Sequence, residues 1–153
     1  MKNTKVLDII QAREILNQSF NLPLRVNTIY AGGLSIDIGE IKTGTKQKAE
    51  WGLKAGQYII SIEGKWKILK NDKLLFEWPD FEDDKVKLFF NEVQPVIKIK
   101  GIVFDKSGHN TEFLLSHDIK IVVPFSDTDD WFFLFDNRTK TLLSSNGSMK
   151  IQK

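Results

Sequence analysis

The sequence contains no cysteine, and this absence excludes a disulfide framework, a thiolate metal site and a cysteine nucleophile. Histidine is almost as rare, because His109 and His117 are the only two. A zinc site needs about four nitrogen, sulfur or carboxylate ligands, so two histidines without a thiolate make a poor zinc centre. No apolar run reaches the ~20 residues of a membrane-spanning helix, and the charged N-terminus lacks the pattern of a signal peptide. We therefore expect a soluble, cytoplasmic protein that engages no membrane.

Recognisable catalytic motifs are also missing. The sequence holds no G-x-S-x-G, H-E-x-x-H, Walker A or Rossmann fingerprint. The run Ser116–Asp118 has the residue types of a catalytic triad, but neighbours at a strand end point in different directions and indicate a turn. The acidic residues Asp127, Asp129 and Asp130 lack the glycine and the terminal glutamate of a calcium-binding EF-hand loop. We expect no enzymatic activity, no cofactor and no metal ion.

The chain does contain enough apolar material for a core. It has 153 residues, with 41% hydrophobic and 27% charged side chains, an ordinary balance for a globular protein. Eleven phenylalanines and four tryptophans supply large side chains, each of which buries about 150–250 Å². We expect a single domain over residues 1–153, with an N-terminal helix at about 4–20 and a β-rich body at about 24–152.

The charges are distributed unevenly along the chain. Between Phe76 and Asp136 there are 13 acidic side chains and 6 lysines, whereas residues 1–75 carry 12 basic and 7 acidic groups. The formal net charge of +2 therefore hides an acidic middle segment in an otherwise basic chain. Such asymmetry indicates a charged partner, but it does not identify any chemistry.

Residues 4–20 carry the strongest helical pattern. The apolar positions are three and four residues apart and so share one face: Ile9, Ala12, Leu16 and Phe20. The helix is expected to be capped by Asn3 or Thr4 and to stop at Asn21, before Pro23. We expect its apolar face to pack on a sheet rather than on a partner.

From Leu24 onward the pattern changes to the two-residue alternation of strands. Strands are predicted at 24–30, 34–38, 58–62, 65–69 and 74–78. Glu63-Gly64 is a good two-residue hairpin signal between 58–62 and 65–69, and Asn71-Asp72 turns the chain into the next strand. The polar, basic segment 40–50 is expected to be a surface loop.

The second half is also rich in short alternating runs. Further strands are predicted at 96–104, 111–116, 120–125, 131–135 and 141–143. The turns between them are expected at Ser107-Gly108, His117-Asp118 and Asn137-Arg138. In the first of these strands, the isoleucines at 97, 99 and 102 are expected to face inward and Lys98 and Lys100 outward. Such short connections indicate antiparallel pairing.

A short central helix is predicted at residues 83–92. Val86, Phe89, Phe90 and Val93 recur at helical spacing, and the preceding carboxylates favour a helix N-terminus. A strand stays open as the alternative, because residues 86, 88 and 90 also alternate. The predicted fold class is α+β, mostly antiparallel sheet with an N-terminal helix and this short central helix.

Two stretches of the sequence resemble a small uncharacterised bacterial family. The first contains GGLSIDIGEI, EWGL and IEGKWKIL, and the second runs from Val96 through DIKIVVPFSDTDDWFFLF. Proteins with this pattern are similar to immunity proteins of contact-dependent or polymorphic bacterial toxin systems, which bind a cognate toxin domain and cover its active site. The resemblance spans about residues 24–143 and implies a binding protein without its own catalysis. It transfers no functional residue, because its motifs are structural.

Two acidic runs, each beside an aromatic residue, form the candidate partner-binding surface. The first run comprises Asp80, Glu82, Asp83 and Asp84 and contains Phe81; the second comprises Asp127, Asp129 and Asp130 and precedes Trp131. Carboxylates steer a basic partner to the surface, and buried aromatic anchors supply affinity. Nuclease-type toxins need lysine or arginine to hold phosphate, so an acidic surface is suited to cover them. The expected partner is a cognate toxin with a basic surface.

Two other functions stay open at this point. The lysines near Trp66 and in the loop at 40–50 form a possible nucleic-acid surface, with aromatic residues to stack on bases: Lys42, Lys46, Lys48, Lys65, Lys67 and Lys70. Trp66 is predicted to point away from Lys65 and Lys67, however, which weakens this hypothesis. A closed β-barrel around a small apolar ligand is the second alternative, and it predicts an internal cavity.

Overall fold

The computed structural model describes residues 4–29, 32–39, 58–90, 97–104, 110–124, 129–135, 140–145 and 148–152. The first half contains β1 (Thr4–Leu7), α1 (Ile9–Asn17), β2 (Leu24–Thr28), β3 (Leu34–Ile38), β4 (Tyr58–Ile62), β5 (Lys67–Lys70), β6 (Lys73–Glu77) and α3 (Asp83–Leu88). The second half contains β7 (Ile99–Phe104), β8 (Thr111–Leu115), β9 (Ile119–Val123), β10 (Asp129–Phe135), β11 (Lys140–Ser145) and β12 (Ser148–Gln152). The prediction of an α+β protein dominated by antiparallel sheet is confirmed.

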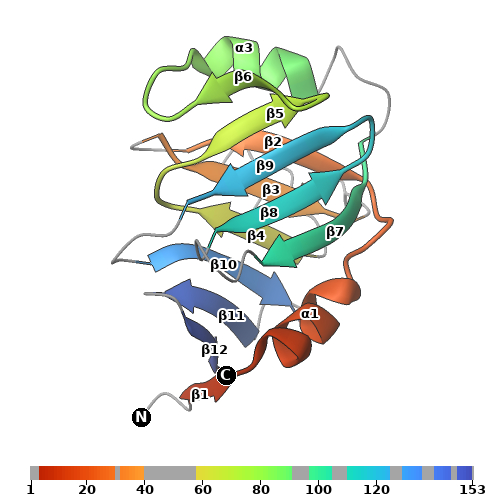
Figure 1. Cartoon of the computed structure of the whole chain (residues 1–153), viewed down its shortest axis with the longest axis vertical. Helices are drawn as coiled ribbons and strands as arrows, with labels where there is room; N and C mark the ends of the chain where they lie inside the picture. Colours follow the sequence, from red (N-terminus) through yellow and green to blue (C-terminus); the bar gives the residue numbers. More distant parts are fainter. Residues whose placement is uncertain are drawn as a thin grey trace, which may run out of the picture.

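The described strands form two antiparallel sheets. The larger has the order β1-β12-β11-β10-β4-β3-β2, and the smaller has the order β6-β5-β9-β8-β7. The two helices lie at opposite ends of the molecule, with α3 beside β6 and α1 near β7 and β12 (Figure 1). The edges of the two sheets meet at one corner, where the backbone N–H of Leu24 donates to the carbonyl of Ile97 at 2.9 Å. Pro23 and Lys98 form an isolated antiparallel bridge at the same corner.

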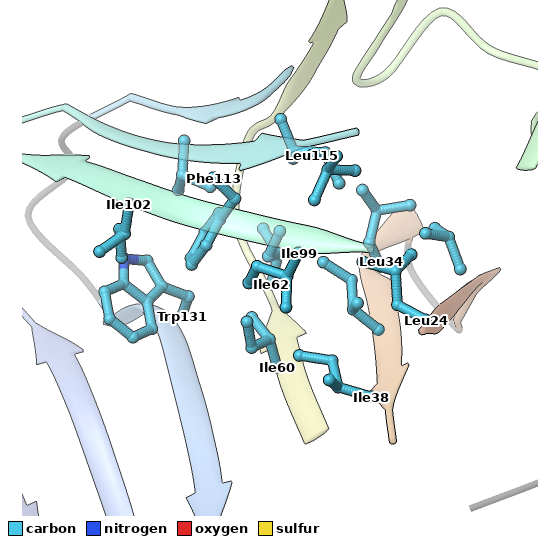
Figure 2. Close-up of a cluster of buried hydrophobic side chains, with 14 of the residues drawn as sticks. Leu24, Leu34, Ile38, Ile60, Ile62, Ile99, Ile102, Phe113, Leu115 and Trp131 are labelled. Carbon is cyan, nitrogen blue, oxygen red and sulfur yellow. The ribbon is translucent and has the colours of Figure 1, made fainter. Parts of the chain in front are cut away.

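The core lies between the two sheets. Side chains from β7 and β8 point toward side chains from β2, β3, β4 and β10 (Figure 2). Phe113 and Trp131 are both fully buried, and their ring centroids are 5.3 Å apart. Because these rings come from different sheets, their contact joins the two layers. Burial of large apolar side chains of this kind is the main favourable contribution to folding.

The predicted N-terminal helix is confirmed as α1, but the predicted start of this helix is wrong. Residues 4–7 form the strand β1, which pairs with β12, and the helix begins only at Ile9. Asp8 is the N-cap: its carboxylate accepts from the backbone N–H of Gln11 at 2.8 Å, and the Gln11 side chain accepts from the Asp8 N–H at 3.1 Å. Ala12 and Leu16 are fully buried as expected, whereas Ile9 is 37% exposed. None of the helices among the described residues is long and apolar enough to span a membrane.

Replacing the N-cap residue tests this local structure. The Asp8→Ala variant removes one acceptor of the capping box, so we expect its free energy of unfolding to fall by about 1 kcal/mol. Asp8→Asn is the matched control, because it keeps an oxygen acceptor at the same position. Urea unfolding followed by far-ultraviolet circular dichroism measures both variants. Equal stability of Asp8→Ala and the parent protein would contradict a contribution from the cap.

The predicted hairpin across Glu63-Gly64 is wrong. Strand β4 pairs with β3 and β10 in the larger sheet, whereas β5 pairs with β6 and β9 in the smaller sheet. The chain therefore crosses from one sheet to the other between residues 62 and 67. Trp66 fixes this crossing, because its buried indole donates from Nε1 to the carbonyl oxygen of Gly32 at 2.8 Å.

Two of the predicted turns are confirmed. Asn71 and Asp72 join β5 to β6 with φ angles of 52° and 63°, and His117 and Asp118 join β8 to β9 with φ angles of 62° and 57°. Both φ angles are positive in each turn, which is typical of two-residue hairpins that follow the twist of the strands. The predicted turns at 107–108 and 137–138 and the predicted loop at 40–50 lie outside the described residues.

The central helix is confirmed at Asp83–Leu88, continued by a π-helical turn at residues 89 and 90. Residues 91 and 92 of the predicted helix lie outside the described residues. Val86 is fully buried and Phe90 is 4% exposed, whereas Leu88, which a strand would turn to the same face, is 47% exposed. The helix packs on β2, while the Phe89 ring lies against Phe76 of β6 at 5.8 Å. Helix α3 thus contacts the larger sheet through β2, and the turn that follows it contacts the smaller sheet through β6.

Candidate protein-binding site

A groove of about 720 Å³ lies beside helix α3, and we call it the aromatic groove. The sheet contributes residues at the end of β2 and in the turn that follows: Thr28, Ile29 and Gly32. The remaining lining comes from the segment after β6 and from α3: Trp78, Pro79, Phe81, Asp83 and Lys87. It is larger than a second groove of about 530 Å³, which lies at the turns that precede β6 and β9.

The groove is assembled around a buried tryptophan and a glycine. The rings of Trp66 and Phe81 are 4.8 Å apart at an interplanar angle of 56°, and the backbone N–H of Trp78 donates to the Trp66 carbonyl at 3.0 Å. Gly32 has a φ angle of 86°, and a Cβ atom there would lie 2.7 Å from Trp78 Nε1. Only glycine combines this backbone conformation with so close an approach. Trp78 and Phe81 are consequently held half-buried, at the groove surface.

Asp83 of the first acidic run lines this groove, and the other carboxylates of the run are sequence neighbours of lining residues. Asp80, Glu82, Asp83 and Asp84 are all exposed, and Phe81 is half-buried between them. Glu82 is the one member of the run with an ion pair among the described residues, to Lys85 at 3.4 Å. Both partners of that pair are about two-thirds exposed, at 71% and 67%, so it contributes little to stability. Sequence reasoning thus placed this run correctly on the surface.

The second acidic run begins at the same end of the larger sheet as the aromatic groove. Its members Asp129 and Asp130 start β10, while Asp127 lies outside the described residues. In the sheet register, Trp131 pairs with Ile62, Ile62 with Leu34, and Leu34 with Thr28. Three strand spacings of about 4.8 Å therefore separate the start of β10 from the groove wall. The end of β4 and the start of β10 both lie on the left in Figure 1.

Trp131 is not part of an accessible surface, and this prediction needs correction. Its side chain is fully buried, and its indole Nε1 donates to the hydroxyl oxygen of Thr111 at 3.0 Å. The ring also packs against Phe104 and Phe113, at centroid distances of 6.5 and 5.3 Å. Trp131 starts the inward-facing set of β10, which continues with Phe133 and Phe135. A partner cannot reach this side chain in the folded protein.

Sequence reasoning missed the residue that replaces Trp131 as an aromatic neighbour of the acidic runs. Trp78 lines the groove together with Phe81, only two positions before the first carboxylate of the run. The signal was present in the order Trp78-Pro79-Asp80-Phe81, which places two large aromatic residues around an acidic turn. The role of Gly32 had no local signal, because its contact with Trp78 joins residues far apart in the sequence.

The possible nucleic-acid surface formed by the lysines has no accessible tryptophan at Trp66. Trp66 is 1% exposed, so its ring cannot stack on a nucleic-acid base. Lys65 and Lys67 are exposed, but Lys70 is half-buried and its Nζ lies 5.9 Å from the centre of the Phe89 ring. The loop lysines at 42, 46 and 48 lie outside the described residues.

No metal centre is found in the part of the chain that the structure describes. No group of three or more histidine and carboxylate side chains there could hold a metal ion, and His109 lies outside that part. The Ser116 hydroxyl accepts from the backbone N–H of Lys98 at 2.8 Å, so it belongs to the turn that also contains His117 and Asp118. The described strands form two open sheets rather than one closed barrel.

No model of a known protein family matches this chain, and no curated protein or solved structure matches it either.

Proposed function

We propose that this protein is a non-catalytic binding module that recognises a basic surface on another protein. The observation that carries the proposal is the placement of four exposed carboxylates beside two half-buried aromatic rings, those of Trp78 and Phe81. Charge complementarity raises the rate of encounter with a basic partner. Aromatic side chains that are already held in place supply affinity at a small cost in conformational entropy.

The partner that we propose is a cognate bacterial toxin domain, with this chain acting as its immunity protein in the cytoplasm. The resemblance over residues 24–143 supports the immunity assignment, and the acidic runs support a basic target. Toxins that cleave nucleic acids hold phosphate groups with lysine and arginine side chains, which makes their active sites positively charged. An acidic surface of this kind is suited to cover such a site and block it.

Co-purification and toxicity together test this proposal. The tagged protein is used to capture partners from a lysate of the producing organism at low and high salt, and the captured proteins are identified by mass spectrometry. We expect a stoichiometric complex with one basic protein, and we expect co-expression of this chain to restore growth of cells that produce that protein. Recovery of nucleic acid that salt releases would instead support binding through the lysines, and no rescue of growth would remove the immunity assignment.

Charge reversal of the first acidic run is expected to slow association with the partner. The Asp83→Lys/Asp84→Lys variant removes the attraction that steers a basic protein, so its association rate should fall roughly tenfold at low salt. The salt sensitivity of that rate should fall as well. Stopped-flow or biolayer measurements at several salt concentrations report both effects.

A matched pair of single variants separates position from net charge. Asp84→Lys and Glu14→Lys change the net charge equally, but Glu14 is an exposed residue of α1, at the other end of the molecule (Figure 1). We expect Asp84→Lys to slow association more strongly than Glu14→Lys. Equal effects would show that only net charge matters and would remove the first acidic run from the interface. Circular dichroism confirms that each variant is folded.

A further inference from the structure

The aromatic groove combines two kinds of group that recognise cations. Trp78 and Phe81 present indole and phenyl rings at its surface, and Asp83 contributes a carboxylate to its wall. The face of an aromatic ring attracts a cation within about 6 Å, and indole does so most strongly. Asp80 and Asp84, both exposed beside the groove, add further negative charge. The chemistry of the lining therefore selects a positively charged and partly apolar group.

We propose that the groove receives an arginine side chain of the partner protein. A planar guanidinium group stacks on aromatic faces and simultaneously donates two parallel hydrogen bonds to a carboxylate such as that of Asp83. A lysine ammonium group is a more strongly hydrated point charge and matches the flat rings less well. This inference rests on the proposed function for the existence of a protein partner, and it adds the side chain that enters the groove.

Lys87 provides an internal check on the inference. It lines the same groove and lies four residues after Asp83 on α3, a spacing at which two side chains are neighbours. Its side chain therefore brings a positive charge to the lining of the groove in the free protein. An incoming guanidinium must displace it or bear its repulsion. Removal of the Lys87 charge should therefore strengthen binding of an arginine, whereas removal of the Asp83 charge should weaken it.

A peptide titration tests the proposal without the partner. The probes are an acetylated and amidated Gly-Arg-Gly peptide and its counterpart with citrulline, which has the same shape without the positive charge. The reporter is the indole N–H signal of Trp78 in a nitrogen–proton NMR spectrum, assigned with the Trp78→Phe variant. We expect this signal to shift saturably with the arginine peptide, with a dissociation constant on the order of 1–10 mM. The citrulline peptide should produce a clearly weaker response.

Three variants that each remove one charge should change the affinity for the arginine peptide in different ways. Asp83→Asn should weaken arginine-peptide binding about tenfold, because a charge-assisted hydrogen bond is lost. Lys87→Gln should strengthen it about twofold, because a like charge is removed. Lys85→Gln is the matched control: it removes the same charge from α3, but Lys85 pairs with Glu82 and does not line the groove. Its effect should be smaller than that of Lys87→Gln.

The outcomes separate this inference from the proposed function. Equal responses to the two peptides, no saturable shift at Trp78, or indifference to Asp83→Asn would each overturn the arginine assignment. If any of these occurred while Asp83→Lys/Asp84→Lys still slowed association with the captured protein, the binding function would stand and the groove would not be its arginine site. Specific arginine binding without any protein partner would support the groove and overturn the proposed function.

Discussion

Replacement of Trp131 by alanine is expected to lower the free energy of unfolding by about 3–5 kcal/mol. The indole is fully buried between the two sheets, so its removal leaves a large cavity. The same change deprives Thr111 of the hydrogen bond that crosses from β10 to β8. Urea unfolding followed by circular dichroism measures the loss, and the variant should unfold at a much lower urea concentration than the parent protein.

Two further variants divide this effect into its parts. Trp131→Phe keeps most of the ring packing but removes the Nε1 donor, and it should cost about 1–3 kcal/mol. Combined with Thr111→Val, it should cost less than the sum of the two single changes, because both act on the same hydrogen bond. A Trp131→Ala variant with unchanged stability but weakened partner binding would contradict the core role and restore this residue to the interface.

The local elements of this fold could be predicted because their patterns depend on neighbours in the sequence. In the strand that includes β7, Ile97 and Ile99 are buried and the lysines at 98 and 100 are exposed, as their alternation indicated. Ile102 is also buried, because the register shift between Ile99 and Gly101 turns it to the same side. The central helix was favoured over a strand by the recurrence of Val86, Phe89 and Phe90 at helical spacing. Val86 and Phe90 are buried, whereas Leu88, which a strand would turn to the same face, is 47% exposed. Periodicity reports which face of an element is apolar, and burial then follows.

The assignment of strands to sheets could not be predicted in the same way. Glu63 and Gly64 have the composition of a tight hairpin, yet the flanking strands belong to different sheets. The deciding contacts are long-range: β10 occupies the side of β4 that a hairpin partner would have taken, and Trp66 is held by Gly32. Residues 4–7 were assigned to the helix for a related reason, because their partner β12 comes from the other end of the chain.

The candidate site was predicted in part. The carboxylates from Asp80 to Asp84 were placed on the surface correctly, because exposed acidic groups favour the start of a helix such as α3. Trp131 was placed wrongly, although the burial of alternate residues at 131, 133 and 135 follows the two-residue period of a strand. An acidic neighbour says little about where an aromatic side chain points, whereas the period of the strand does.

Replacement of Gly32 by alanine is expected to damage both the fold and the aromatic groove. Its φ angle of 86° lies in the left-handed region, which costs a residue with a Cβ atom about 1–2 kcal/mol. The new methyl group would also lie 2.7 Å from Nε1 and 2.9 Å from Cδ1 of Trp78, so the indole must move. Such overpacking typically costs a further 1–3 kcal/mol. We expect a total loss of about 2–5 kcal/mol in the free energy of unfolding, measured by urea denaturation.

Gly64→Ala is the matched control for this prediction, because a Cβ atom at Gly64 would meet nothing within 4 Å. That variant should retain nearly the stability of the parent protein. In Gly32→Ala, the indole N–H signals of Trp78 and Trp66 should both shift, since one ring is displaced and the other donates to the Gly32 carbonyl. If Gly32→Ala kept its stability and left both signals unchanged, Gly32 would not position these rings. A common response of both signals would instead show that one backbone position sets the rings of the groove and the crossing between the two sheets.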